Sequence, residues 1–269
     1  MRIPRAWTRG LLLLALSLYT VYSAGPFAWV AVMSLRTTSE ISADPYALPS
    51  HFHWDKYLTA WTTSHYGTYF WNSAAVVVAA VAILTIIGSM VAHCLARYRF
   101  RGNRLIYFLI FSAIIFPPQV TIISLFQVLV EYGLFNTRTG LTLVYISIQL
   151  PLTMYLLEGF FAQIPQDLFD AAKIDGCSDF NIFWRLTLPV GLPAIATTII
   201  LNFISLWNEF LFAVVLITDE EKRTLPLGIQ RFMGDQMQDI GMISTGLMIA
   251  IIPVIVIYVL FSEKLIQGM

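Results

Sequence analysis

The chain has 269 residues and a formal net charge of zero; 58% of the residues are hydrophobic, 14% are aromatic and only 12% are charged. Soluble domains carry about 45–50% apolar and about 25% charged residues. These figures and the mean hydropathy of +0.73 therefore indicate an integral membrane protein with no room for a large soluble domain. The balanced charge gives no sign of a nucleic-acid partner.

Six stretches are long and apolar enough to cross the hydrocarbon core of a lipid bilayer as helices, which takes about 20 residues. They run Leu11 to Met33, Ala74 to Leu95, Leu105 to Val130, Leu141 to Phe161, Val190 to Ile217 and Ile243 to Phe261. Pro117-Pro118 and Pro151 interrupt the third and fourth, which a bundle tolerates because neighbouring helices satisfy the freed carbonyls. The sequence thus predicts an all-α membrane protein with six transmembrane helices, built as a single transmembrane domain over residues 1–269 with a core of roughly residues 70–262.

The first stretch has two interpretations. Arg2, Arg5 and Arg9 followed by Leu11 to Leu18 resemble the start of a secretory signal peptide. The apolar run continues to Met33, however, and this length suits a membrane helix better than a cleaved leader. We therefore expect an uncleaved first transmembrane helix.

The orientation follows from the Lys and Arg residues near the helix ends, which are more numerous on the side of the N-terminus. They are densest in the short loop after the second helix, which holds Arg97, Arg99, Arg101 and Arg104. This bias predicts that both termini are cytoplasmic and that the chain lies in the cell (inner) membrane. Cys94 and Cys177 then lie on the cytoplasmic side, where we expect reduced thiols.

The cytoplasmic loop between the fourth and fifth predicted helices carries helix signals of its own. Proline suits the first position of a short helix over Pro165–Ile174, and Gly176 supplies a left-handed turn that ends it. Ser178 can cap a second helix, Asp179 to Leu186, which Pro189 ends. The apolar side chains of this loop are too frequent for a free segment, so they must face lipid, the chain's own bundle or a partner.

The same loop resembles the EAA loop of ABC importer permeases. The similarity lies in Asp170-Ala171-Ala172-Lys173-Ile174-Asp175-Gly176 and in Leu186-Thr187-Leu188-Pro189. Asp170 stands where these permeases usually have Glu, and Leu186 where they usually have Ile. Further stretches are similar to the carbohydrate branch, which includes maltose-type and glycerol-3-phosphate-type importers: Gly133-Leu134-Phe135-Asn136-Thr137, Phe160-Phe161-Ala162-Gln163-Ile164-Pro165 and Trp207-Asn208-Glu209-Phe210-Leu211.

The resemblance implies that the loop of residues 162–189 is a coupling helix that docks on a separate ATP-hydrolysing subunit. It implies that the docking residues are Asp170, Ala171, Ala172, Lys173, Asp175, Gly176, Phe180, Leu186 and Pro189. A helix lying on the membrane surface is the alternative, but such a helix is usually rich in Lys and Arg. In this loop Asp outnumbers Lys173 and Arg185, which favours a protein partner.

The resemblance also implies the remaining partners. They are a second, related permease subunit, two copies of the ABC ATPase, an extracytoplasmic solute-binding protein that docks on residues 34–71 and 218–242, and a sugar substrate moved by alternating access. ATP and Mg²⁺ would be used by the ATPase, with no cofactor bound by this chain. Many relatives extend beyond Gln267-Gly268 with a basic tail, so we expect coupling here to depend more on the 162–189 loop.

Four polar or aromatic residues are candidates for the substrate pathway: Gln119, Trp207, Asn208 and Glu209. Glu209 is an ionisable residue deep in a predicted helix, and such residues usually face a cavity or a partner. The alternative is a hydrogen bond that fixes the packing of the helices, which we favour for the Trp207–Glu209 trio. For Gln119, beside the Pro117-Pro118 break, pathway lining and repair of the kink remain equally open.

The sequence lacks the motifs of the common ATPase, metalloprotease and serine hydrolase classes. The sequence has no GxxxxGK[ST] phosphate loop, no HExxH and no GxSxG, so we expect no catalytic residue in this chain. His51, His53 and Asp55 are too few for a convincing metal site, and a surface turn is the better interpretation. An ATP-independent secondary transporter or channel is the alternative function, although the sequence shows no convincing internal repeat.

Overall fold

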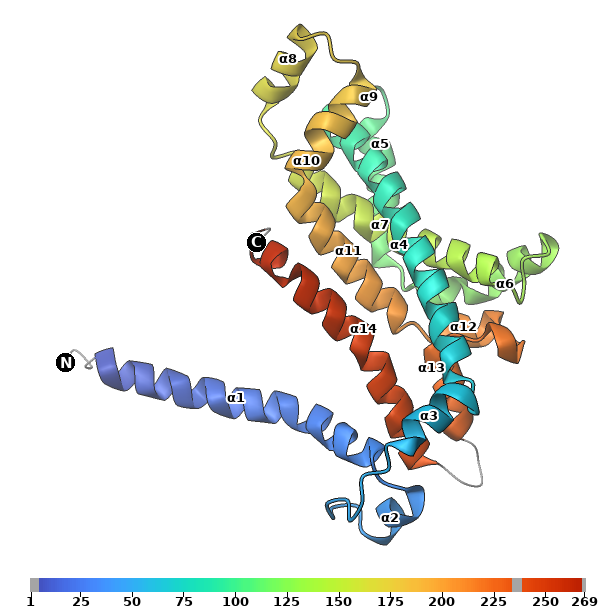
Figure 1. Ribbon diagram of the computed structural model, residues 1–269. Coiled ribbons are helices and arrows are strands. Elements are labelled where there is room, and N and C mark those ends of the chain that lie inside the picture. The colour runs from blue at the N-terminus through green and yellow to red at the C-terminus, as the bar shows by residue number, and fades with distance from the viewer. Residues whose placement is uncertain (1–4, 234–238, 268–269) are drawn as a thin grey trace. The chain divides into compact units, whose positions relative to one another are not determined.

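The computed structural model describes residues 5–233 and 239–267, with side chains described over residues 9–233 and 239–260. Arg2 and the side chain of Arg5, named above at the start of the first stretch, lie outside these ranges. Every regular element in the described part of the chain is helical, which confirms the all-α prediction. In chain order the α-helices are α1 (Arg5–Ser34), α2 (Thr38–Ala43), α3 (Asp55–Thr62), α4 (Tyr66–Arg97), α5 (Asn103–Ile115), α6 (Ile122–Glu131), α7 (Arg138–Phe161), α8 (Gln166–Ile174), α9 (Asp179–Ile182), α10 (Leu188–Val190), α11 (Leu192–Trp207), α12 (Leu211–Leu216), α13 (Leu225–Gln230) and α14 (Ile240–Gln267) (Figure 1).

The chain divides into two compact units. The first comprises Met1–Gly67 and Ile229–Ile251, and the second comprises Thr68–Gly228 and Ile252–Met269. The first unit holds α1 to α3 and the start of α14, and the second holds most of α4 together with α5 to α12.

Four helices in the described residues are long and apolar enough to cross a membrane: Arg9–Ser34, Tyr66–Arg97, Arg138–Phe161 and Ile240–Leu260. Two further pairs qualify when each is taken as one bent span. These are Asn103–Ile115 with Pro118–Glu131, bent by 95°, and Asp179–Val190 with Leu192–Trp207, bent by 76°. The chain therefore has four to six candidate spans.

The interruption predicted at Pro117-Pro118 is present, whereas α7 continues through Pro151 and the fifth predicted span is unexpectedly broken. The stretch Leu105 to Val130 is divided by the 95° bend, because Phe116 is extended ahead of Pro117-Pro118 and a 3₁₀ turn follows. The stretch Val190 to Ile217 contains two helices, since α11 ends at Trp207 and α12 starts at Leu211.

In the first unit, two loops that are far apart in sequence meet. Thr38 donates a hydrogen bond to the carboxylate of Asp239 and accepts one of 3.1 Å from the amide of Gly241. The ammonium group of Lys56 donates to the carbonyl of Arg36 over 2.6 Å, and burial lowers the pKa of this lysine. These contacts join residues 34–71 to the start of α14.

The second unit is built around α4, α7 and α11. Gly88 of α4 lies so close to α7 that an added Cβ would come within 2.6 Å of the Thr153 methyl group. The hydroxyl of Thr153 accepts a buried hydrogen bond of 2.8 Å from the side-chain amide of Asn202 on α11. A small residue on one helix and a polar bridge to the next are typical of helices packed in membranes.

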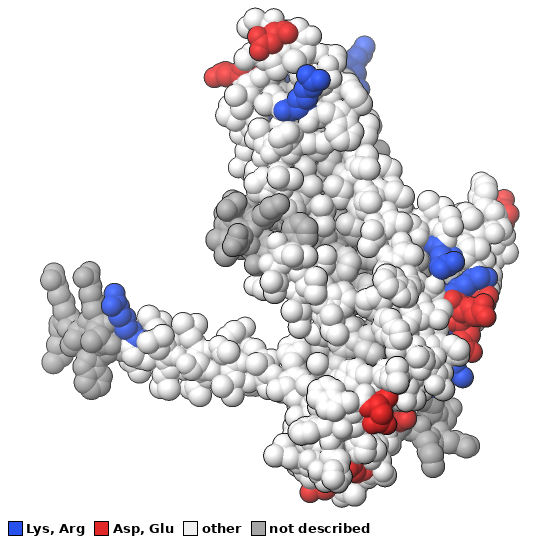
Figure 2. All heavy atoms as spheres, in the orientation of Figure 1, with Lys and Arg blue, Asp and Glu red and all other residues white. Residues whose placement is uncertain are grey.

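On the face of the second unit drawn in Figure 2, charged side chains gather at two ends. One end carries α8 and α9, and the other lies beside α6 and α12. The surface between them is uncharged, as expected for helices that contact hydrocarbon.

The close approach at Gly88 leads to a testable prediction. Gly88→Ala forces α4 and α7 apart, so it should destabilise the purified protein by about 1–3 kcal/mol. Gly159→Ala is the matched control, because a Cβ at this helical glycine of α7 meets open space. Thermal melting of the detergent-solubilised protein should show a lower midpoint for Gly88→Ala alone. Equal midpoints for the two variants would contradict the packing of α4 on α7.

Candidate functional site

The two short helices predicted between the fourth and fifth spans are present as α8 and α9. Pro165 is the N-cap of α8 rather than its first helical residue, so the predicted start is wrong by one position. Gly176 adopts the left-handed conformation, with φ +78°, as predicted for the turn between the helices. The hydroxyl of Ser178 accepts a 3.3 Å hydrogen bond from the amide of Asn181 and caps α9, which confirms that prediction.

The end of the second short helix differs from the prediction. The α-helical turn stops at Ile182, and a π-helical turn over Phe183–Thr187 leads into α10. Pro189 does not end the helix but lies in the first turn of α10, where a missing N–H costs no hydrogen bond. The break falls at Gly191, where a Cβ would lie 2.4 Å from the Phe161 ring, so only glycine fits without movement.

The apolar side chains of this loop divide between two environments. Phe169, Ile182 and Phe183 are buried, and the first two join a core formed by the C-terminal ends of α4 and α7 and the N-terminal end of α11. Ile174 and Phe180, by contrast, are 87% and 65% exposed. One side of the loop therefore packs on the chain's own bundle, and the other presents apolar surface.

Most of the predicted docking residues lie on the exposed side. Ala172 and Leu186 are half-buried against the core, so their contacts lie largely within the chain. The remaining residues of the predicted set are exposed: Asp170, Ala171, Lys173, Asp175, Gly176, Phe180 and Pro189.

The C-terminal end of α4 holds this loop in place. The guanidinium group of Arg97 donates hydrogen bonds to the carbonyls of Phe161 and Ile164, the latter over 2.6 Å. The same group lies 4.0 Å from the centre of the Phe169 ring, which is a cation–π contact. In the sequence, Arg97 stands out only as one of the arginines that indicate the orientation of the chain. No sequence signal distinguishes it from its neighbours, because its contacts come from residues more than 60 positions away.

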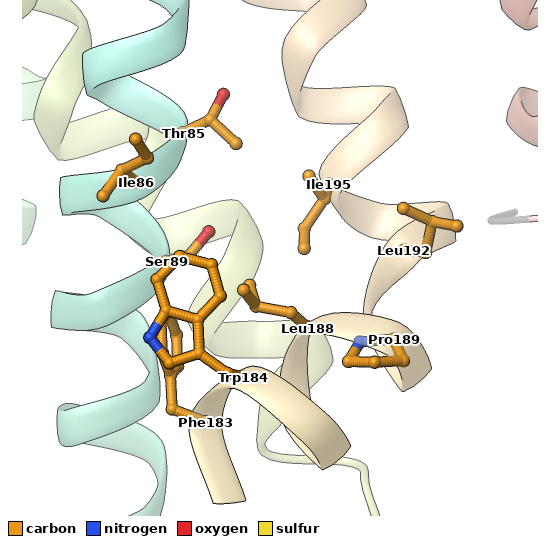
Figure 3. Close-up of a pocket in the computed structure, with 9 residues that line it drawn as sticks. All are labelled: Thr85, Ile86, Ser89, Phe183, Trp184, Leu188, Pro189, Leu192 and Ile195. Atoms are coloured by element: carbon orange, nitrogen blue, oxygen red, sulfur yellow. The ribbon is translucent and has the colours of Figure 1, made fainter. Parts of the chain in front are cut away.

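A cavity of about 480 Å³ lies beside the π-helical turn (Figure 3). It is lined by residues of α4, the π-helical turn, α10 and α11: Thr85, Ile86, Ser89, Phe183, Trp184, Leu188, Pro189, Leu192 and Ile195. The lining is mainly apolar, and the buried hydroxyl of Ser89 has no hydrogen-bond partner in the described part of the chain. The cavity is thus lined by Pro189 and Leu192 on either side of the bend, while Gly191 itself packs closely against the Phe161 ring.

The predicted pathway residues lie in different environments. Trp207 is 2% exposed and stacks on Phe203, with ring centres 5.5 Å apart. Asn208 is exposed, and its amide donates to the carbonyl of Ile204 over 2.8 Å. Gln119 is exposed in the 3₁₀ turn at the bend of the third predicted span. A role for these residues along the substrate pathway stays a prediction.

Glu209 lies at the break between α11 and α12 rather than inside a helix. Its carboxylate accepts hydrogen bonds from the amides of Phe212 (2.7 Å) and Ala213 (3.2 Å), which caps α12. It also accepts a 2.7 Å bond from the hydroxyl of Tyr145 on α7. This arrangement is the inter-helix hydrogen bond that the sequence analysis favoured over a pathway role.

Of the two histidines interpreted as part of a surface turn, His53 lies near two carboxylates. His53 lies 3.7 Å from the carboxylate of Glu40 and 3.9 Å from that of Asp55. Within residues 5–233 and 239–267, no group of three or more metal-ligating side chains could hold a metal ion.

Comparison with known proteins identifies the family. Residues 84–266 match the family described as binding-protein-dependent transport system inner membrane component. This chain belongs to that family. The match confirms the resemblance to ABC importer permeases, and it makes the chain a multi-pass inner-membrane component whose ATPase is a separate subunit.

Curated relatives of this transport family align over nearly the whole chain. The diacetylchitobiose uptake system permease protein NgcG of Streptomyces coelicolor is 38% identical over 252 residues, which cover 93% of this chain and 83% of the relative. The trehalose transport system permease protein SugB of Mycobacterium tuberculosis is 32% identical over 92% of this chain and 91% of its own length.

A solved structure shows the same fold. It is a bacterial ABC transporter involved in the import of the acidic polysaccharide alginate, with a TM-score of 0.85. The match covers 98% of this chain and 99% of that chain at 22% sequence identity, and so it bears on the fold alone.

The environment of Glu209 separates its two possible roles. Glu209→Ala leaves two α12 amides and the Tyr145 hydroxyl without their acceptor, so it should destabilise the permease by about 1–3 kcal/mol. Tyr145→Phe removes one of the three donors and should cost less. Melting curves of both variants test this order. A pathway role for Glu209 would instead appear as a raised KM for the solute with an unchanged melting temperature.

Proposed function

We propose that this chain is the permease subunit of an ATP-driven importer that moves a sugar or sugar-like solute across the cell membrane. The observation that carries the proposal is the exposed apolar face of α8 and α9 in a member of this transport family. The relatives described above are named for diacetylchitobiose and trehalose, and another is named for starch degradation products. These names favour a carbohydrate, and an oligosaccharide above all.

In this proposal Asn103–Ile115 with Pro118–Glu131 is one bent span and α11 with α12 is another, while α9 and α10 stay in the cytoplasmic loop. This arrangement gives six spans and cytoplasmic termini. The hydrogen bonds of Arg97 support the side assigned to α8 and α9. They hold the end of α4, and with it the start of the arginine-rich 97–104 loop, beside the start of the α8 segment. Both the positively charged loop and the 162–189 loop then lie on the cytoplasmic face.

The importer would also contain a second, related permease subunit, two ABC ATPase copies and an extracytoplasmic solute-binding protein. A solved alginate transporter that matches this chain with a TM-score of 0.70 is in complex with a periplasmic protein carrying an alginate pentasaccharide. In this chain the side chains of α1 from Arg9 to Phe27 are exposed, which suits contact with lipid or with the partner permease. The loops joined by Thr38 and Asp239 would face the binding protein.

The transport cycle would be alternating access. ATP and Mg²⁺ bound to the ATPase pair would draw the two ATPase subunits together, and the exposed face of α8 and α9 would follow that movement. The bend at Gly191 beside the cavity would let α11 change its angle, so that the pathway opens outward. ATP hydrolysis would then reset the pathway. An ATP-independent transporter or channel would need none of this exposed apolar face.

Docking of the ATPase can be tested with Ile174→Asp/Phe180→Asp. These side chains are exposed, so the double variant should fold as the wild type does. Placing unpaired carboxylates in an interface should cost about 3 kcal/mol or more of association free energy. Leu48→Asp, another exposed aliphatic position (76% exposed), is the control.

The measurement is co-purification from detergent-solubilised membranes. The ATPase should co-purify with the wild type and with Leu48→Asp, but not with the double variant. Purification of the wild type alone, with solute uptake into liposomes in the absence of ATP, would instead establish the ATP-independent transporter.

A further inference from the structure

We propose that the inner end of α4, through His93, Arg97 and Tyr98, is the receiver that transmits movement of the α8–α9 loop to the transmembrane bundle. This inference rests on the proposed function and adds positioning residues to it. The peptide chain joins the loop to α7 and to α11 but not to α4. Side-chain contacts are therefore what connects α4 to the moving loop.

The three residues contact three successive parts of the loop region. Arg97 bonds to the carbonyls of Phe161 and Ile164 and lies over the ring of Phe169, and so it engages the end of α7 and the centre of α8. A guanidinium group suits this role because its donors are fixed in a plane and can bind two carbonyls at once.

The other two residues hold α9 and the turn that follows it. The ring nitrogen Nδ1 of His93 and the hydroxyl of Thr187 share a buried hydrogen bond of 3.0 Å at the end of the π-helical turn. Tyr98 lies near the carboxylate of Asp179, in the first turn of α9, and both residues line a small cavity between α4 and the loop. Burial and this carboxylate raise the pKa of Tyr98 to about 12, so the phenol stays protonated and remains a donor.

Close packing makes the contact able to pass on small movements. Ala92 of α4 is fully buried in the same core as Phe169 and Ile182. The cavity that remains among α4, α8 and α9 has a volume of about 40 Å³, room for about one water molecule. A displacement of α8 must therefore displace α4, because packed interiors do not absorb strain by compression.

The test is the number of solute molecules transported per ATP hydrolysed. The complete transporter, with both permeases, the ATPase pair and the binding protein, is reconstituted in proteoliposomes. Arg97→Met keeps the length of the side chain and removes the guanidinium, and we expect the transport ratio to fall about tenfold, as ~1.4 kcal/mol of lost coupling would produce. Arg97→Lys retains the positive charge but cannot bond both carbonyls in the same way. Its transport ratio should therefore lie between those of Arg97→Met and the wild type.

The matched control is Arg101→Met, which removes the same charge from an exposed position in the same short loop. Its transport ratio should equal that of the wild type, which excludes an effect of net charge or membrane orientation. A purely structural role for Arg97 would reduce the amount of active transporter and lower transport and ATP hydrolysis together. It would leave their ratio unchanged.

A wild-type ratio in Arg97→Met would overturn the inference. If Arg97→Met fails to fold, Tyr98→Phe and Thr187→Val decide, since each removes a single hydroxyl with little change in shape. A lowered ratio of solute transported to ATP hydrolysed in both variants supports the transmission of movement through α4. An unchanged ratio in both variants overturns it. The wild type is measured first. If it shows no ATP-driven uptake, the proposed function itself is wrong.

Discussion

Water is absent from the hydrocarbon core, so the backbone groups freed at each break in a membrane helix must be paired within the protein. This constraint explains the placement of the polar side chains in the second unit. At the Asn208 break, the carboxylate of Glu209 accepts hydrogen bonds from the amides of Phe212 and Ala213 in the first turn of α12. At the end of α7, the guanidinium of Arg97 takes the carbonyl of Phe161 and, beyond it, that of Ile164. The polar side chains that lower the hydropathy of a predicted span are therefore the ones that pair the backbone groups where the helix breaks.

The same pairing makes the coupling region a defined body rather than a loose loop. Phe169 and Ile182 anchor its inner side in the core, whereas Ile174 and Phe180 remain outside it. Two kinds of apolar residue therefore serve two purposes within one short segment. The anchored residues tie the loop to α4, α7 and α11, and the outer residues present apolar surface, which in the proposed function binds the ATPase. The π-helical turn and the bend at Gly191 lie between this body and the long part of α11.

Much of this arrangement could be predicted from the sequence, because it depends on local chemistry. Composition predicted the membrane, Gly176 predicted the left-handed turn, and Ser178 predicted the cap of α9. The breaks at Gly191 and Asn208 were not predicted, since both lie within the long, largely apolar stretch Val190 to Ile217 and tertiary contacts decide where it breaks. The same holds for Arg97, whose partners are distant in sequence. The roles of Gln119 and Trp207 in the pathway, and the single-domain organisation over residues 1–269, stay predictions.

The most direct test of the account is the sidedness of transport. Proteoliposomes of one orientation are given ATP either on the side of the α8–α9 loop or on the opposite side, with the solute-loaded binding protein across the membrane from the ATP. The account predicts solute movement only when ATP is on the side of the 162–189 loop, and always toward that side. Solute movement without ATP, or with ATP on the other side alone, would contradict it.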